Sequence, residues 1–390
     1  MLRKCTIAAA AVALLALGPH GAIAEEALKI GMSMPMTGLG FNAVGRQISA
    51  AVRLYMQQHG DQVAGRKIEV IMRDDAGVAD TARRIVQEMI VNDKVGIVGA
   101  DITPAALAIA PLVTQAKMAT VVLVSGASVT VDRSPYMVRT SFTLGQSSSI
   151  MGQWAAKNGS KRVVTLVNDW APGTEAEAAF VASFTQGGGE IIEKLRIPLA
   201  NPDFAPFLQR IRDLAPDTAF IYFPGTQAGI FAKQFAERGL DKSGIRIIGP
   251  GDLTDDDELN GMGDAMLGIV TAHHYSATHD SALNKAYVEA FRKANNFRPN
   301  FISVGGYDGM HLIYEALKKT GGKTNGDTLI AAMKGMAWES PRGTISIDPE
   351  TRDIVQPIYI RKVERLGGEL YNTEFQTFEA VRDPMKAAKK

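Results

Sequence analysis

The chain has 390 residues and carries 42 Lys plus Arg against 41 Asp plus Glu, a formal net charge of +1 at pH 7. This balance argues against nucleic acid or an anionic membrane as the main partner. The length exceeds what one hydrophobic core usually serves, so it predicts two lobes.

The N-terminus has the three parts of a secretory signal peptide. Arg3 and Lys4 precede an apolar run from Ile7 to Leu17, which is too short to span a bilayer. Ala22-Ile23-Ala24 then places small residues at a cleavage site. We expect cleavage after residue 24 and a periplasmic mature protein. A retained membrane anchor is the alternative, but no second long apolar stretch follows.

The only cysteine, Cys5, lies within the segment that we expect to be removed. The mature chain would begin at Glu25 without a thiol. It would then have no disulfide and no cysteine-based metal site, and core burial alone would stabilise it.

Strand and helix alternate through the first part of the mature chain. Apolar residues at Ile48, Ala51, Val52 and Tyr55 follow the spacing of a helix that packs on a sheet. We predict strands from Leu28 and over residues 67–73, 95–98 and 120–124, and helices around 48–55, 81–91 and 104–117. This alternation is typical of a mostly parallel sheet.

The alternation restarts after Lys161. We predict strands at 162–167, 190–197, 219–223, 246–248 and 269–272, helices at 174–185, 204–213 and 227–238, further helices after 280 and at 303–318, and final strands at 344–347 and 356–363. The predicted fold is therefore α/β, with two doubly wound parallel-sheet lobes joined by hinge strands. We place hinges at 140–143 and 274–277, lobe 1 at 25–142 plus 276–351, and lobe 2 at 143–275 plus 352–384.

Two open sheets place a ligand in the cleft between them, at the carboxyl ends of the strands. In lobe 1, Thr103 and Pro104 open a helix directly after a strand, which favours an anion at the helix N-terminus. The alternative is that Thr103 only caps its own helix. The next strand ends in Ser125, Gly126 and Ser128, whose small polar groups make a carboxylate pocket plausible.

In lobe 2, two strands end in further candidate binding residues. Trp170 can cover a flat ligand, while Pro172 and Gly173 allow a close backbone approach. Pro224 and Gly225 follow another strand. The alternative is a tryptophan that shields the core from solvent, followed by an ordinary turn.

Other motifs are weaker. Phe41 and Asn42 offer an aromatic face and an amide before the first helix, and Asp252 is a further cleft candidate. Asp255 and Glu258 have the spacing of a capping box, which favours a helix start over calcium.

Several familiar sites are excluded by their spacing. The glycines from Gly38 to Gly45 match neither a phosphate loop nor a dinucleotide fingerprint, and His273, His274 and His279 lack the spacing of a zinc motif. No nucleophile elbow or Cys/His pair is present. We therefore expect no cofactor, no metal and no enzymatic activity.

A set of short segments, in order along the chain, carries a family resemblance. They are Met36-Thr37-Gly38, Asp74-Asp75, Gly99 to Thr103, Ser125 to Ser128, Asp169 to Gly173, Pro216-Asp217, Gly249-Pro250 and Tyr307-Asp308. On these segments the chain resembles the solute-binding proteins of ATP-driven (ABC) importers, in the family typified by the leucine/isoleucine/valine-binding protein of the bacterial periplasm. The resemblance implies a type I periplasmic binding fold and a membrane permease as partner, and we expect a monomer.

The resemblance also implies roles for residues. It assigns the ligand carboxylate to Thr103, Gly126 and Ser128, and the cover of the ligand to Phe41 to Val44. The amine anchors of the branched-chain binders are a tyrosine and a glutamate. Pro224 and Gly251 stand at their positions, although Asp252 is adjacent. A buried ammonium without partners would be costly, which counts against an amino acid.

Relatives that bind aromatic acids are similar in having an aromatic residue before Pro-Gly, as in Trp170 to Gly173. We therefore predict an aromatic carboxylate of the benzoate or hydroxycinnamate type. Its carboxylate would lie at Thr103 and Ser128, and its ring between Phe41, Trp170 and Tyr275. A branched-chain or other hydrophobic amino acid is the second hypothesis and a short amide the third. A ligand-sensing receptor is the alternative of another class.

Overall fold

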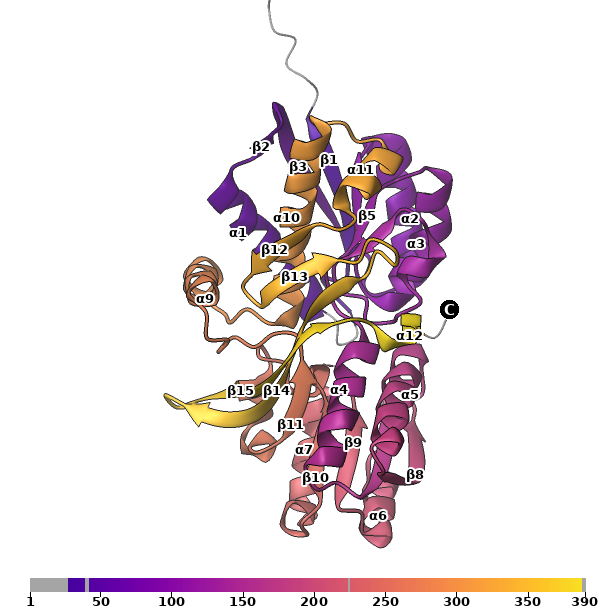
Figure 1. Cartoon of the computed structure of the whole chain (residues 1–390), viewed down its shortest axis with the longest axis vertical. Helices are drawn as coiled ribbons and strands as arrows, with labels where there is room; N and C mark the ends of the chain where they lie inside the picture. Colours follow the sequence, from indigo (N-terminus) through magenta and orange to yellow (C-terminus); the bar gives the residue numbers. More distant parts are fainter. Residues whose placement is uncertain (1–26, 39–41, 224, 388–390) are drawn as a thin grey trace, which may run out of the picture.

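The computed structural model describes residues 27–38, 42–223 and 225–387. The predicted signal peptide, Phe41 and Pro224 lie outside these ranges. Figure 1 shows two α/β lobes stacked along the long axis, with the hairpin of β14 (Ile354–Leu366) and β15 (Glu369–Val381) beside the waist between them. Within the described ranges, no helix combines the length and apolar character needed to cross a bilayer.

Lobe 1 is built on a six-stranded sheet in the order β2-β3-β1-β4-β5-β6, parallel except for β2. Its strands are β1 (Leu28–Met34), β2 (Gln62–Val63), β3 (Arg66–Asp74), β4 (Ile97–Ala100), β5 (Thr120–Val122) and β6 (Met137–Arg139). The helices are α1 (Asn42–His59), α2 (Ala79–Glu88), α3 (Thr103–Gln115), α9 (Ala282–Asn295), α10 (Phe301–Thr320) and α11 (Gly326–Met333). Figure 1 shows α1 and α10 on one side of the sheet and α2 and α3 on the other.

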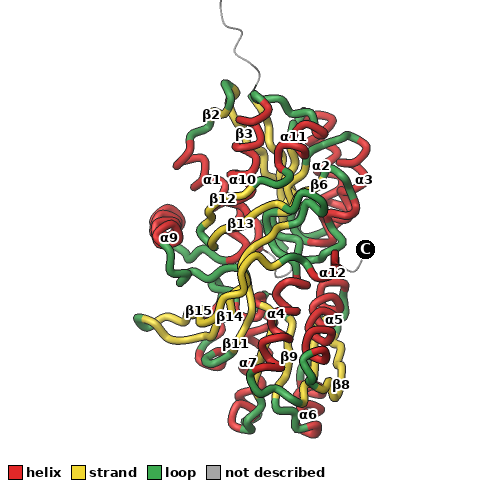
Figure 2. Tube along the Cα trace, viewed as in Figure 1, coloured by secondary structure: helices red, strands yellow, loops and turns green. Residues whose placement is uncertain are grey.

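Lobe 2 contains five parallel strands in the order β11-β10-β9-β7-β8, and antiparallel β14 continues this sheet into β13 and β12, which lie beside α10 of lobe 1 (Figure 1). These are β7 (Arg162–Asn168), β8 (Glu190–Ile197), β9 (Thr218–Tyr222), β10 (Arg246–Pro250), β11 (Val270–His273), β12 (Ala337–Ser340) and β13 (Gly343–Ile347). The helices are α4 (Leu144–Lys157), α5 (Ala171–Gln186), α6 (Ala205–Leu214), α7 (Gln227–Glu237), α8 (Leu259–Met262) and α12 (Pro384–Ala387). Figure 2 shows the helices flanking the strands in both lobes.

The period of two along β7 divides the core of lobe 2. Val163 and Val167 join the apolar cluster shared with lobe 1, whereas Val164 and Leu166 join a second cluster that includes residues of α6 and α7. Because neighbouring side chains of a strand point to opposite faces, a strand buried on both faces reads as a continuous apolar run.

The chain crosses between the lobes through irregular segments at 140–143, 274–281 and 348–353. The first two include the predicted hinges. A fully buried arginine forms hydrogen bonds or an ion pair with each crossing. A buried guanidinium charge is stable only where hydrogen-bond acceptors or a carboxylate compensate it. The bonded pairs are Arg139 with Asp353, Arg342 with the carbonyl of Ser141, and Arg361 with the carbonyl of Tyr275.

The predicted strands and helices are confirmed, with shifted ends. Strands β2, β6, β12 and β15 and helices α4, α11 and α12 were not predicted. Helix α4 begins with Leu-Gly-Gln-Ser-Ser-Ser, whose residues have mostly low helix propensity. A capping box between Thr143 and Gln146 and packing against α5 stabilise it. The lobe boundaries stay a prediction.

Candidate functional site

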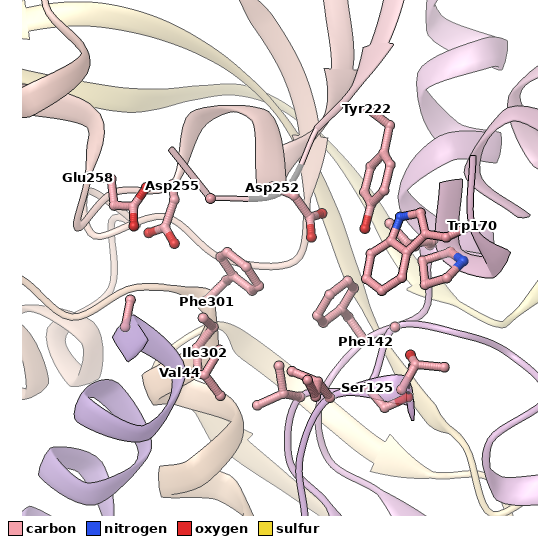
Figure 3. A pocket seen from close by; sticks show the side chains of 18 residues that line it. Val44, Ser125, Phe142, Trp170, Tyr222, Asp252, Asp255, Glu258, Phe301 and Ile302 are labelled. Atoms are coloured by element: carbon pink, nitrogen blue, oxygen red, sulfur yellow. Dashed lines mark hydrogen bonds between the residues drawn. The ribbon is translucent and has the colours of Figure 1, made fainter. Parts of the chain in front are cut away.

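A pocket with an empty volume of about 680 Å³, part of it open to solvent, lies between the lobes. Lobe 1 lines it with Ala43, Val44, Ile102, Thr103, Val124, Ser125 and Gly126. Lobe 2 lines it with Trp170, Pro172, Tyr222, Gly225, Asp252, Asp255 and Glu258. Phe142, Leu144, Phe301 and Ile302 complete it (Figure 3). The volume suits one small molecule.

Hydroxyl groups form the lobe 1 end of the pocket. The hydroxyls of Thr103 and Ser125 are 2.8 Å apart, and Ser125 lies 2.8 Å from the hydroxyl of Thr130. Helix α3 has Ile102 at its N-cap, without a side-chain cap, so the prediction that Thr103 is the N-cap is wrong. The Thr103 hydroxyl therefore lies at the helix N-terminus with no capping role, where an anion is favoured.

Arg139 orients the loop that contains Gly126. Its guanidinium donates to the carbonyls of Ser125 and Ala127, the latter at 2.8 Å. In a planar trans peptide the N–H points opposite to the C=O, so the Gly126 N–H points away from Arg139. A Cβ on Gly126 would lie only 3.0 Å from the ring of Phe142. A side chain at this position would therefore press on the Phe142 ring, so glycine fits best, and its N–H adds a donor at the hydroxyl end.

The N–H of Ser128, two residues further along the same loop, is already bonded. Ser128 donates from its N–H and its hydroxyl to one carboxylate oxygen of Glu175, at 2.9 and 2.7 Å. Glu175 lies in the first turns of α5, so this contact joins lobe 1 to lobe 2. Ser128 does not line the pocket. In this structure its donors serve an inter-lobe bond.

Aromatic rings form the middle of the pocket. Phe142 and Phe301 meet edge to face, with ring centroids 5.4 Å apart. Trp170 and Tyr222 approach from lobe 2 (Figure 3). His274 stacks under Phe142, and His273 packs on Phe301. Burial lowers the pKa of both histidines well below the usual value. A flat apolar ligand fits between such rings.

The lobe 2 end of the pocket is acidic. Asp252, Asp255 and Glu258 all line it, and burial raises the pKa of each carboxyl. Asp255 accepts two hydrogen bonds from the Asn300 amide, at 2.9 and 3.0 Å. For Asp252 the pKa is raised to about 6. Its Oδ2 is excluded from solvent and has no hydrogen-bond partner among the described residues.

Seven predicted site residues come together in this pocket, and three other described ones make contacts within the fold. Thr103, Ser125, Gly126, Trp170, Pro172, Gly225 and Asp252 line it, whereas Ser128, Gly173 and Tyr275 do not. A Cβ on Gly173 would lie 2.1 Å from the carbonyl oxygen of Asn168, the last residue of β7. This glycine therefore allows α5 to pack closely against the end of β7. Tyr275 is fully buried, and its carbonyl accepts from Arg361. Phe41, Pro224 and the side chain of Asn42 are outside the described structure.

Two details of the sequence interpretation change. Helix α5 begins at Ala171 rather than near 174, because Pro172 suits the first turn of a helix. A short helix does start near the predicted capping box, but at Leu259, with Glu258 rather than Asp255 at the N-cap.

The sequence interpretation missed Phe142, Phe301, Asp255, Glu258 and Tyr222 as pocket residues. Tyr222 ends β9, beside the predicted Pro224-Gly225 turn, so its position at a strand end was an available signal. Phe142 and Phe301 carry no local signal, because they reach the pocket from a crossing and a helix start far apart in the chain.

The three histidines that lack the spacing of a zinc motif make other contacts. His279 pairs with Glu374 at 2.8 Å, while His273 and His274 pack among phenylalanines. Within the described ranges, no group of three or more His, Cys, Asp or Glu side chains is arranged to hold a metal ion.

Residues 27–369 match the family model described as periplasmic binding protein. Leu/Ile/Val-binding protein homolog 6 of Brucella suis is 41% identical, over 97% of this chain and 98% of that protein. A solute binding protein of an ABC transporter from Rhodopseudomonas palustris BisB5, solved with 3,4-dihydroxybenzoic acid, is 63% identical with a TM-score of 0.90, over 93% of this chain and 100% of that chain.

A second solute binding protein, from R. palustris HaA2 with p-hydroxybenzoic acid, is 37% identical with a TM-score of 0.90, over 93% of this chain and 100% of that chain. These likenesses confirm the predicted two-lobed type I periplasmic binding fold. The family is one of transport proteins located in the periplasm. The chain belongs to the periplasmic binding protein family, as a solute-binding component of an ABC importer of the leucine/isoleucine/valine-binding type.

Proposed function

We propose that this protein captures an aromatic carboxylate of the benzoate or hydroxycinnamate type and delivers it to a membrane permease. One arrangement carries the proposal: the uncharged donors of Thr103 and Gly126 lie at one end of a slot walled by Phe142, Phe301 and Trp170. Hydroxyl and N–H donors at a helix N-terminus stabilise a carboxylate, and the rings stabilise a flat apolar body. The solved relatives with bound benzoic acids support the same ligand class.

A hydrophobic amino acid is the second candidate. The Brucella relatives are named for leucine, isoleucine and valine, and the Asp252 carboxylate has an oxygen, unpaired among the described residues, that an ammonium group would bond. The aromatic slot and the higher identity to the 3,4-dihydroxybenzoic acid complex favour the aromatic acid. A short amide or a sensory role has no specific support in the pocket.

A ligand screen tests the proposal. The protein is unfolded and refolded to remove co-purified ligand, and its thermal unfolding is then measured with benzoate, 4-hydroxybenzoate, a hydroxycinnamate and leucine. At a hundred times its Kd, a ligand adds about 2.7 kcal/mol to the free energy of unfolding. We expect the aromatic acids to stabilise the protein and leucine to have no effect. Stabilisation by leucine alone would disprove the proposal.

A variant locates the carboxylate in the same screen. Thr103→Val keeps the shape of the side chain but removes the hydroxyl, so every aromatic acid should bind about tenfold more weakly. Thr174→Val is the matched control, because Thr174 is outside the pocket lining and its hydroxyl donates to the Ala171 carbonyl of its own helix. Equal affinities in Thr103→Val and wild type would place the carboxylate elsewhere.

We also propose that the exported protein begins at Glu25, is a monomer and catalyses no reaction on its ligand. The tripartite N-terminal segment supports the first point. For the last, the described residues that line the pocket include carboxyl groups but no nucleophile paired with a base of the kind that covalent catalysis requires. Recovery of the ligand unchanged after prolonged incubation is the expected result.

A further inference from the structure

The two ends of the pocket differ in chemistry, and this difference sets the direction of a bound acid. Thr103 and Gly126 of lobe 1 offer neutral donors, whereas Asp252 and Glu258 of lobe 2 each have a buried carboxylate oxygen without a partner among the described residues. A ligand carboxylate at the acidic end would face like charges that are poorly screened. The ligand carboxylate therefore lies at the lobe 1 end, and its far edge meets lobe 2.

Asp252 is held rigidly at this far edge. It lies in a short 3-10 turn, Gly251–Thr254, directly after β10. Arg361 bonds the turn from behind, through the Gly251 carbonyl at 3.3 Å and the Thr254 hydroxyl at 3.4 Å. A Cβ on Gly251 would lie 2.2 Å from that guanidinium, so the approach requires glycine. The backbone of this turn has little freedom to withdraw Asp252 from the pocket.

The Oδ2 of Asp252, unpaired within the described structure, favours a ligand that offers a hydrogen-bond donor. Its Oδ2 is buried and unbonded, and Figure 3 shows the carboxyl directed into the pocket beside the hydroxyl of Tyr222. A buried carboxylate left without a donor costs binding free energy that a hydrogen bond recovers. Burial, and then Asp252, raise the pKa of Tyr222 well above its usual value, so its hydroxyl stays protonated and adds a second polar partner.

We propose that Asp252 and Tyr222 form a hydroxyl subsite: Asp252 accepts a hydrogen bond from a hydroxyl at the 4-position of the ring, so the protein selects 4-hydroxybenzoates over unsubstituted benzoates. The inference rests on the proposed function and goes beyond it, because it assigns the ring substituent and the residues that read it. The 4-position is the ring carbon farthest from the carboxylate, and Phe142 and Phe301 lie between Asp252 and the Ser125 end (Figure 3).

Calorimetry on the wild-type protein tests the subsite without any variant. The ligands are 4-hydroxybenzoate, benzoate and 4-methylbenzoate, whose methyl group has nearly the size of a hydroxyl but donates no proton. A hydrogen bond to a buried charged acceptor predicts about tenfold or greater preference for 4-hydroxybenzoate over both others. Equal binding of 4-methylbenzoate and 4-hydroxybenzoate would overturn the inference and leave the proposed function standing. Failure of all three and of a hydroxycinnamate to bind would instead remove the proposed function.

Two variants assign the preference to residues. Asp252→Asn removes the charge, so it should bind 4-hydroxybenzoate about tenfold more weakly and benzoate more tightly than wild type. Tyr222→Phe should weaken 4-hydroxybenzoate alone, and retained benzoate binding shows that either variant is folded. The matched control is Asp213→Asn, an exposed aspartate on α6, which should change neither affinity. An unchanged ratio of the two affinities in Asp252→Asn would refute the role of Asp252.

Discussion

At the scale of single residues, buried arginines shape both ends of the pocket without touching the ligand space. Arg139 binds the carbonyls of Ser125 and Ala127, which fixes the loop whose Gly126 lines the pocket. Arg361 bonds the turn that carries Asp252. A guanidinium has five donors in a fixed plane, so it can hold several carbonyls at once, which a lysine ammonium does less rigidly.

The raised pKa of Asp252 makes the stability of the ligand-free protein depend on pH. Its folded pKa of about 6 is above the ordinary aspartate value of 3.8, so folding disfavours the ionised form and this cost is present above pH 6. Asp252→Asn should therefore be more stable than wild type at neutral pH, by about 3 kcal/mol. The advantage should shrink as the pH falls through 6 toward 4.

Urea unfolding of both proteins at several pH values measures this difference. The comparison between variants is needed because His273 and His274 have lowered pKa values and act in the opposite direction, destabilising the fold as they become protonated. A stability difference that stays constant between neutral and acidic pH would contradict the assignment to Asp252.

At the scale of elements, two contacts close the cleft from opposite lobes. The first turns of α5 supply Glu175 to the loop of Ser128, and α1 supplies Arg46 to Asp257 in the segment before α8. Neither pair belongs to the pocket lining. A hinge motion that separates the lobes has to break both, so these bonds stabilise the closed arrangement.

Glu175→Gln should speed ligand release. The amide keeps the shape of the side chain but weakens the bonds to the N–H and hydroxyl of Ser128, which exist only when the lobes meet. Because hydrogen bonds to a charged carboxylate are stronger than those to a neutral amide, the ligand should dissociate several-fold to tenfold faster from Glu175→Gln than from wild type. Stopped-flow measurement of dissociation and association checks this. Glu190→Gln, at an exposed position of β8, is the control. A slower association with unchanged dissociation would argue against the closing role.

At the scale of the whole molecule, the three crossings and the shared apolar core determine how the lobes are linked. The larger core cluster runs from lobe 1 into one face of the lobe 2 sheet, and buried arginines bond each crossing. Relative motion is then confined to a hinge, because a packed core does not deform continuously.

Native mass spectrometry of protein exported by a Gram-negative host tests the proposed mature form. We expect a monomer whose mass corresponds to a chain starting at Glu25, because the small residues at Ala22 and Ala24 fit a signal peptidase site. A full-length mass in the membrane fraction would favour the anchored alternative. A stable dimer would contradict the monomer proposal.

The sequence by itself determined the alternation of strands and helices, the two-lobed class and the pocket residues that directly follow strands, among them Thr103, Gly126 and Asp252. These follow from periodicity and from the rule that ligands bind at strand ends. Only the tertiary structure decided that Phe142 and Phe301 wall the pocket, that Ser128 bonds to Glu175, and that α4 is helical. The reason is physical: these outcomes depend on contacts between residues distant in the chain, whose partners no local pattern specifies.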